Sequence, residues 1–282
     1  MDIREPCLPP GWYPGQKDQI AEFIEPIAKN HKTGVFSSRS AISPHAGWFF
    51  SGRLAALAVM SLDSEAETVA VIGGHLPGGM PVLSAREDGA RTPMGVMAID
   101  TELRDEFEKK VSCASDRYQD NTVEVLLPMV QYFFPRAKLL WLRFPSGLAS
   151  FEAGKVLYQT AASLGRRLVV LASTDLTHYG GNYGFSPKGR GKAALDWVKE
   201  VNDASFISAV LERDPKMVLK RGEEDRASCS PGAVLGALGF ISGDNKTESK
   251  HITLLEYQTS ADVLHEAEVP NSFVGYAAIS LP

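Results

Sequence analysis

The sequence predicts an α/β fold: a single domain of three α/β/α layers built on a largely parallel central sheet. Short apolar runs with almost no charge alternate along the chain with segments of helical periodicity. Such runs are typical of strands whose two faces are both covered by helices. The runs lie at residues 39–43, 68–72, 138–144 and 167–172. We find no internal repeat, low-complexity tract or linker in the sequence, so we expect one domain across residues 1–282.

The composition is that of an ordinary globular protein. Of the 282 residues, 44% are hydrophobic and 22% are charged, which allows a sizeable core. The net charge of −5, with no basic patch to offset it, argues against nucleic acid or an anionic membrane as a partner. The opening residues have mixed charge unlike a secretory signal, and three widely spaced cysteines do not suggest a disulfide framework. We therefore expect a cytoplasmic location.

The remaining elements follow from periodicity and from breaker residues. Helices are expected at residues 19–28, 53–62, 101–111, 121–134, 151–164, 191–212 and 232–241. Pro128 predicts a kink in the fourth helix or a later start, and Pro231 suits the first turn of the last. Peripheral strands are expected at 82–84 and 94–99, and closing strands at 253–257 and 274–279. Residues 5–15, 76–79 and 221–226 are expected to be irregular.

Three of the strand-like runs each lead to a histidine just past their carboxyl end. The first run is followed by His45, the second by His75, and the run at 167–172 by His178. In open α/β sheets this edge binds ligands and metals. We expect His45 and His75 to meet at one crevice, on adjacent strand ends. Neighbouring glycines would allow the backbone to approach a ligand closely; they are Gly47, Gly73 and Gly74.

A metal site needs at least one more ligand, and the residues alone leave it open. His178, Asp175 and Cys229 are the candidates. Cys229 lies before Pro231 at a predicted helix N-terminus, where the dipole would favour the thiolate, although a buried inert cysteine fits equally well. Asp175 could orient His178 or raise its pKa for acid–base work, or it could cap a turn beside a surface histidine.

Other chemistry-bearing residues have plainer interpretations. Glu124 suits the first turn of a helix and is interpreted as structural. Cys7 and Cys113 are also interpreted as structural. Trp12 and Trp48 are expected mainly to pack, although Trp48 follows His45 closely enough to line a pocket.

Taken together, the motifs resemble the Memo family (AmmeMemoRadiSam system protein B). They are Arg4–Pro6, Gly11–Pro14, Ser43–Trp48, Ser51–Gly52, Ile72–His75, Thr92–Gly95, Ile99–Asp100, Asn121–Pro128, Ser173–Gly180 and Val274–Ala277. Each motif is short, but their order along nearly the whole chain is specific. The fold of that family is in turn similar to the class III extradiol ring-cleaving dioxygenases.

The resemblance implies a mononuclear transition metal held by His45, His75 and Cys229. Asp175 and His178 would line the same cavity, with His178 as acid–base. A thiolate in place of the carboxylate of the related dioxygenases makes copper or zinc as suitable as iron. The sequence departs from the family pattern in three places: Gly73-Gly74 precede His75, Asn121 replaces a pocket histidine, and Ser230 follows Cys229. An amide cannot relay a proton as an imidazole does.

These observations predict a metal-dependent oxidoreductase related to the extradiol dioxygenases, acting on a small molecule. A non-catalytic adaptor that binds a metal or a peptide is the first alternative, and a metal-dependent hydrolase is the second. The resemblance also implies AMMECR-type and radical-SAM proteins as partners.

Overall fold

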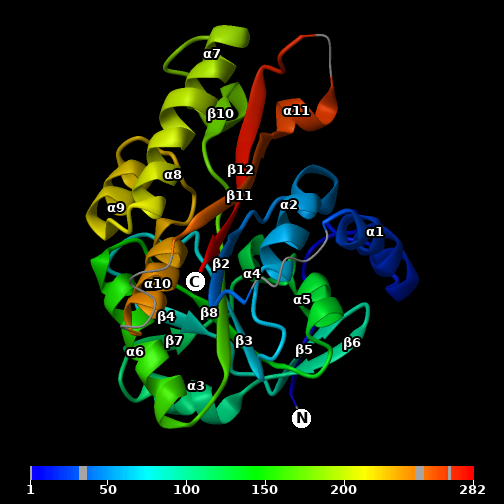
Figure 1. The fold of residues 1–282 in the computed structure, drawn as a ribbon, viewed down its shortest axis with the longest axis vertical. Helices are drawn as coiled ribbons and strands as arrows, with labels where there is room; N and C mark the ends of the chain where they lie inside the picture. Colours follow the sequence, from blue (N-terminus) through cyan, green and yellow to red (C-terminus); the bar gives the residue numbers. More distant parts are fainter. Residues whose placement is uncertain (1, 32–36, 245–250, 266–267) are drawn as a thin grey trace.

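A computed structural model describes residues 2–31, 37–244, 251–265 and 268–282 (Figure 1). Within these residues the main sheet has the strand order β10-β12-β2-β9-β3-β8-β4-β7, and β11 pairs with β12. Its centre is four parallel strands: β2 (Ser40–Ser43), β9 (Leu168–Ser173), β3 (Thr68–Gly73) and β8 (Lys138–Arg143). The strands added outside them run antiparallel to their central neighbours, which makes the sheet mixed but mostly parallel.

Helices cover both faces of this sheet (Figure 1). One face carries α3 (Thr101–Glu108), α6 (Leu148–Ser163), α8 (Asp203–Leu211), α9 (Pro215–Glu223) and α10 (Pro231–Ser242). The other carries α1 (Lys17–Asn30), α2 (Trp48–Met60), α4 (Asn121–Glu124) and α5 (Leu127–Phe133). The predicted α/β fold, with a mostly parallel sheet between helical layers, is therefore confirmed.

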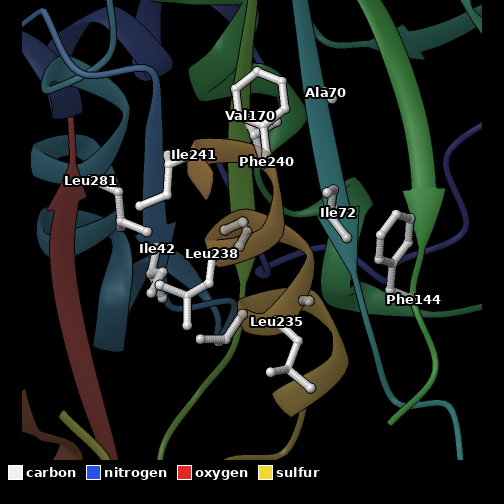
Figure 2. Packing of buried hydrophobic residues seen from close by; sticks show 14 of the residues in the cluster. Ile42, Ala70, Ile72, Phe144, Val170, Leu235, Leu238, Phe240, Ile241 and Leu281 are labelled. Carbon is white, nitrogen blue, oxygen red and sulfur yellow. The ribbon is translucent and has the colours of Figure 1, made fainter. Parts of the chain in front are cut away.

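Alternate residues of each central strand enter different cores. On β3, Ala70 and Ile72 pack on the α10 side, whereas Val69 and Val71 pack on the α2 side. Figure 2 shows the first of these cores, where side chains of α10 lie against β2, β3 and β9. Since both faces are buried, these strands have no polar face, which explains their continuous apolar sequence.

The outer elements complete the fold. They are β4 (Val82–Ser84), β7 (Cys113–Ser115), β10 (His178–Gly180), α7 (Lys192–Trp197), β11 (Thr253–Thr259), α11 (Ser260–Leu264) and β12 (Ser272–Leu281). A separate small sheet has the order β1-β5-β6, from β1 (Ile3–Arg4), β5 (Gly89–Thr92) and β6 (Gly95–Ala98). In the described part of the chain, no helix is long and apolar enough to cross a membrane.

Several predicted boundaries differ from the structure. Helix α2 begins at Trp48, five positions before the predicted start, because Gly47 ends the loop there. The helix predicted at 121–134 is divided into α4 and α5, and Pro128 lies in the first turn of α5. The helix predicted at 191–212 is helical from Lys192 to Leu211 but includes a π-helical segment, Val198–Asn202. The predicted loop at 221–226 is wrong in its first half, since α9 extends to Glu223.

Candidate metal centre

The carboxyl ends of β2, β9 and β3 lie next to one another, and each is followed by a site residue. His45, Asp175 and His75 each come two positions after the last residue of their strand. The expectation that β2 and β3 are adjacent is wrong, because β9 lies between them. The two histidines converge nevertheless: their ring centroids are 4.9 Å apart, with the rings nearly perpendicular at 83°.

Cys229 completes a group of three metal-ligating side chains. One ligand atom from each of His45, His75 and Cys229 lies within 4.8 Å of the others. Cys229 Sγ is 3.2 Å from His45 Nε2. Among the described residues, Asp175 and His178 fall outside this group, so Cys229 is the third candidate ligand that the geometry selects.

Both imidazoles are held by their other nitrogen. His45 Nδ1 is 2.8 Å from Ser173 Oγ, and His75 Nδ1 is 3.0 Å from Asp120 Oδ2. Because each Nδ1 is engaged, Nε2 is the ring nitrogen that remains available to a metal. Metal-ligating histidines almost always use the second ring nitrogen in this way, which fixes the ring and increases its basicity. The donor set thus fits a transition-metal ion.

The glycines before His75 let three segments meet. A Cβ on Gly73 would lie 2.2 Å from Thr122 Oγ1, and a Cβ on Gly74 would lie 2.3 Å from the Cβ of Ser230. Ser230 follows Cys229 directly, so Gly74 allows the two ligand-bearing loops to touch. His75 itself has a positive φ of 56°, which is uncommon for a residue with a side chain. Backbone strain of this kind is concentrated at functional sites.

The three ligands influence one another electrostatically. Burial acts to raise the pKa of the Cys229 thiol, but the nearby His45 and His75 imidazoles outweigh it and hold the pKa well below its ordinary value. Burial acts to lower the pKa of His75, but hydrogen bonds with Asp120 and Cys229 raise it to about 10. Burial also acts to lower the pKa of His45, but the charges of Cys229 and Asp175 outweigh it and raise the pKa. A thiolate is therefore available as a ligand, and an incoming cation would displace the imidazole protons.

Asp120 belongs to a buried charge chain that sequence reasoning missed. Arg143, at the end of β8, is 3.1 Å from Asp120 and 3.3 Å from Asp116, and it also donates to the Gly74 carbonyl at 3.0 Å. Burial acts to raise the pKa of Asp120, but its bonds to His75 and Thr122 and the Arg143 charge lower it. The available sequence signal was an arginine at the end of a strand whose residues 139–142 are all apolar.

Asp175 and His178 lie beside the ligands. Asp175 Oδ1 accepts the His45 amide at 2.8 Å, and its Oδ2 is 3.9 Å from His45 Nε2 and 3.8 Å from His178 Nε2. Burial acts to raise the pKa of Asp175, but these histidines lower it. Burial likewise acts to lower the pKa of His178, but Asp175 and the Cys229 charge raise it. The arrangement can keep a proton on His178 next to an ionised carboxylate.

A cavity of about 680 Å³ opens above this group. His45, His75, Asp175, His178 and Asn121 lie in its wall. The Asn121 amide donates to the His45 carbonyl at 2.9 Å. The rest of the wall includes five aromatic side chains: Trp12, Phe49, Phe50, Tyr183 and Tyr276. Sequence reasoning interpreted Trp12 as a packing residue and did not assign the other four to a cavity.

Trp48 does not line this cavity, contrary to one expectation. It is 3% exposed, packs on Phe23, and donates its indole N–H to the Val125 carbonyl at 2.9 Å. The first turn of α2 turns Trp48 toward the core and leaves Phe49 and Phe50 at the cavity. Glu124 is structural, as expected, but it binds outside its own helix: its carboxylate accepts the amides of Cys7 and Leu8 and the Tyr13 hydroxyl.

Comparison with known proteins identifies the relationship. A family model described as Memo-like protein matches residues 4–280. The chain belongs to the Memo family. The family predicted from the ordered motifs is thereby confirmed.

This Memo family member has full-length relatives in archaea. It is 30% identical to a MEMO1 family protein of Pyrococcus abyssi over 295 residues, which cover 98% of each chain. It is 29% identical to a MEMO1 family protein of Methanosarcina mazei over 286 residues, covering 99% of each. Among solved structures, an uncharacterized protein of Escherichia coli K12 is similar with a TM-score of 0.51 and 13% identity, over 86% of this chain and 99% of that one. This last likeness concerns the fold alone.

Proposed function

We propose that this Memo family member holds one transition-metal ion at His45, His75 and Cys229 and acts as a metal-dependent oxidoreductase on a small molecule. The observation that carries the proposal is the shared orientation of the two imidazoles. Ser173 and Asp120 engage the two Nδ1 atoms, which leaves the Nε2 atoms for a metal. His45 Nε2 is 3.2 Å from Cys229 Sγ, and one ligand atom of His75 lies within 4.8 Å of both other residues' ligand atoms. One thiolate and two imidazoles suit zinc, copper or iron.

Three protein ligands are the number found in catalytic rather than structural sites. A bound ion would supply Lewis-acid or redox chemistry at the coordination positions that the protein leaves open. The cavity reaches His45 and His75, so a substrate of moderate size has access to these open coordination positions.

Asp175 and His178 are assigned to proton handling in this proposal. Asp175 is 4% exposed and holds the His45 amide, which fixes the carboxylate in place. His178 lies in the cavity wall, and its ring is 4.9 Å from that of Tyr183. A histidine paired with a fixed carboxylate is suited to give a proton to a substrate atom in the cavity or to take one from it.

Oxygen uptake with a panel of catechols tests the proposed reaction. Protein purified without oxygen and loaded in turn with iron(II), copper(I) or zinc is compared with His178→Gln and with the surface variant His251→Ala. We expect turnover with at least one redox-active metal, loss of turnover in His178→Gln with metal content unchanged, and no effect of His251→Ala. Turnover that survives His178→Gln would contradict the acid–base role.

One observation favours a second candidate, a non-catalytic metal-binding or peptide-binding protein. Asn121, where the family usually has a histidine, is committed to the His45 carbonyl and cannot transfer a proton. Metal binding without oxygen uptake or ester cleavage would favour this candidate. Ester or amide cleavage without oxygen uptake would instead favour a metal-dependent hydrolase.

A further inference from the structure

One wall of the cavity is a segment of chain that belongs to no helix or strand. Pro10, Gly11 and Trp12 line the cavity, and they lie between β1, which ends at Arg4, and α1, which begins at Lys17. The backbone of such a segment has no ladder of hydrogen bonds to fix its place. Its position beside the metal centre must therefore come from contacts with the rest of the fold.

Glu124, the last residue of α4, holds this segment on both sides of the wall residues. Before them, its carboxylate accepts the Cys7 amide at 2.8 Å, the Cys7 thiol at 2.9 Å and the Leu8 amide at 3.0 Å. After them, it accepts the Tyr13 hydroxyl at 2.9 Å. Glu124 is 4% exposed, and hydrogen bonds to a buried carboxylate are among the stronger ones in proteins. One side chain thus closes the segment into a loop.

The side-chain donors of this loop keep their protons at neutral pH. Burial, together with the hydrogen bond and the charge of Glu124, raises the pKa of the Cys7 thiol to about 11. The same causes raise the pKa of the Tyr13 hydroxyl above its ordinary value. Both groups therefore go on donating to the carboxylate throughout the neutral pH range.

The same short helix is attached to the metal centre. Asn121, the first residue of α4, lines the cavity and donates to the His45 carbonyl at 2.9 Å. The Trp12 carbonyl in turn accepts the Trp48 amide at 2.8 Å, at the start of α2. Asn121 and Glu124 are the two ends of one helical turn, so this turn fixes the spacing between the wall and His45.

We propose that Glu124 is a positioning residue of the cavity, and that the segment it holds sets the size limit for molecules that reach His45 and His75. With Pro10–Trp12 in place, the cavity has a volume of about 680 Å³. Release of the segment would remove one side of this enclosure and admit bulkier molecules. The size limit concerns the substrate of the reaction proposed above and rests on it in that respect, whereas the attachment by Glu124 does not.

Hydrogen–deuterium exchange tests the attachment in the protein as purified. Glu124→Gln removes the charge and puts an amide NH₂ group where an acceptor is needed, so the amides of residues 5–15 should exchange about tenfold faster. Tyr13→Phe removes one donor and leaves the buried carboxylate in place; it should accelerate the same residues several-fold and decides the question if Glu124→Gln does not fold. Glu87→Gln is the matched control, because Glu87 pairs with Arg4 at the start of the segment and not with the wall. Unchanged exchange in the first two variants, or equal acceleration in Glu87→Gln, would overturn the proposal.

Two imidazoles of different size test the size limit. Protein loaded with cobalt(II) is titrated with imidazole and with 4-cyclohexylimidazole, and binding to the ion is followed by its visible absorption. We expect Glu124→Gln to raise the affinity for the bulky ligand about tenfold relative to imidazole. Trp12→Ala, which removes bulk from the wall and leaves the Glu124 contacts, should do the same without faster exchange at Cys7 and Leu8.

Equal changes in affinity for the two imidazoles in both variants would overturn the size limit. A protein that binds no cobalt would contradict the proposed metal centre alone. The exchange experiment needs no ion and would still decide the role of Glu124.

Discussion

Cys229 Sγ lies 3.2 Å from His45 Nε2, although the two residues are 184 positions apart in the chain. His45 follows β2, and Cys229 directly precedes Ser230, the residue before α10. The Cys229 amide also donates to the Asp175 carbonyl at 3.2 Å, which ties this loop to the end of β9. The contact between the thiol and the imidazole therefore depends on two features: the edge of the sheet, which places His45, and the loop before α10, which places Cys229.

Asp120→Asn should weaken metal binding without unfolding the protein. The carboxylate holds His75 Nδ1 and is itself paired with Arg143, so an amide keeps the shape but loses the charge that makes the imidazole a better ligand. Loss of such a partner typically reduces metal affinity about 10-fold to 100-fold. Competition with a chromophoric chelator measures the change, with Asp196→Asn on the surface of α7 as the control. Wild-type affinity in Asp120→Asn would show that Asp120 does not support the site.

Gly74→Ala should damage the site by separating its loops. The new Cβ would lie 2.3 Å from Ser230 Cβ, so the Cys229–Ser230 segment would have to move away from His75. We expect reduced metal content and a lower melting temperature. Gly15→Ala is the matched control, because a Cβ there meets nothing within 4 Å and the φ of Gly15 is not positive. The double variant with Ser230→Gly should recover part of the loss, and a Gly74→Ala protein with full metal content would refute the close-approach argument.

The sequence predicted the convergence of His45 and His75 because the carboxyl ends of parallel strands share one edge of a sheet. It could not distinguish Cys229 from Asp175 or His178 as third ligand, since that depends on where the loop before α10 meets β9. It also could not predict which way the first turn of α2 faces. Trp48, expected mainly to pack, was therefore the residue suggested for the pocket in place of Phe49 and Phe50. Strands β7 and β10 are too short to show a periodicity in the sequence. They form because they pair with neighbouring strands.

Asp203 should make stability depend on pH between about pH 4 and pH 6. Its carboxylate accepts the Thr177 amide at 3.0 Å and the Tyr257 hydroxyl at 2.8 Å, but burial outweighs these bonds and raises its pKa from 3.8 to about 6. In this window the folded protein binds more protons than the unfolded chain, so stability falls as pH rises, by about 3 kcal/mol for this group.

Urea unfolding of the wild type and of Asp203→Asn at several pH values measures that contribution. The amide keeps an acceptor for Thr177 but does not ionise, so the difference in unfolding free energy between the two proteins should change in favour of the variant as pH rises from 4 to 6. A difference that stays constant across this range would mean that Asp203 has an ordinary pKa in the folded protein.

X-ray absorption at the edge of the bound metal tests the central claim most directly. Protein purified without oxygen should contain about one transition-metal ion per chain, with one sulfur and two imidazole nitrogens among its ligands at distances of about 2.3 and 2.0–2.1 Å for zinc. Cys229→Ser should remove the sulfur, and His45→Ala or His75→Ala should remove most of the metal, whereas His251→Ala should change neither. A metal shell without sulfur, or metal content unaffected by both histidine variants, would contradict the account.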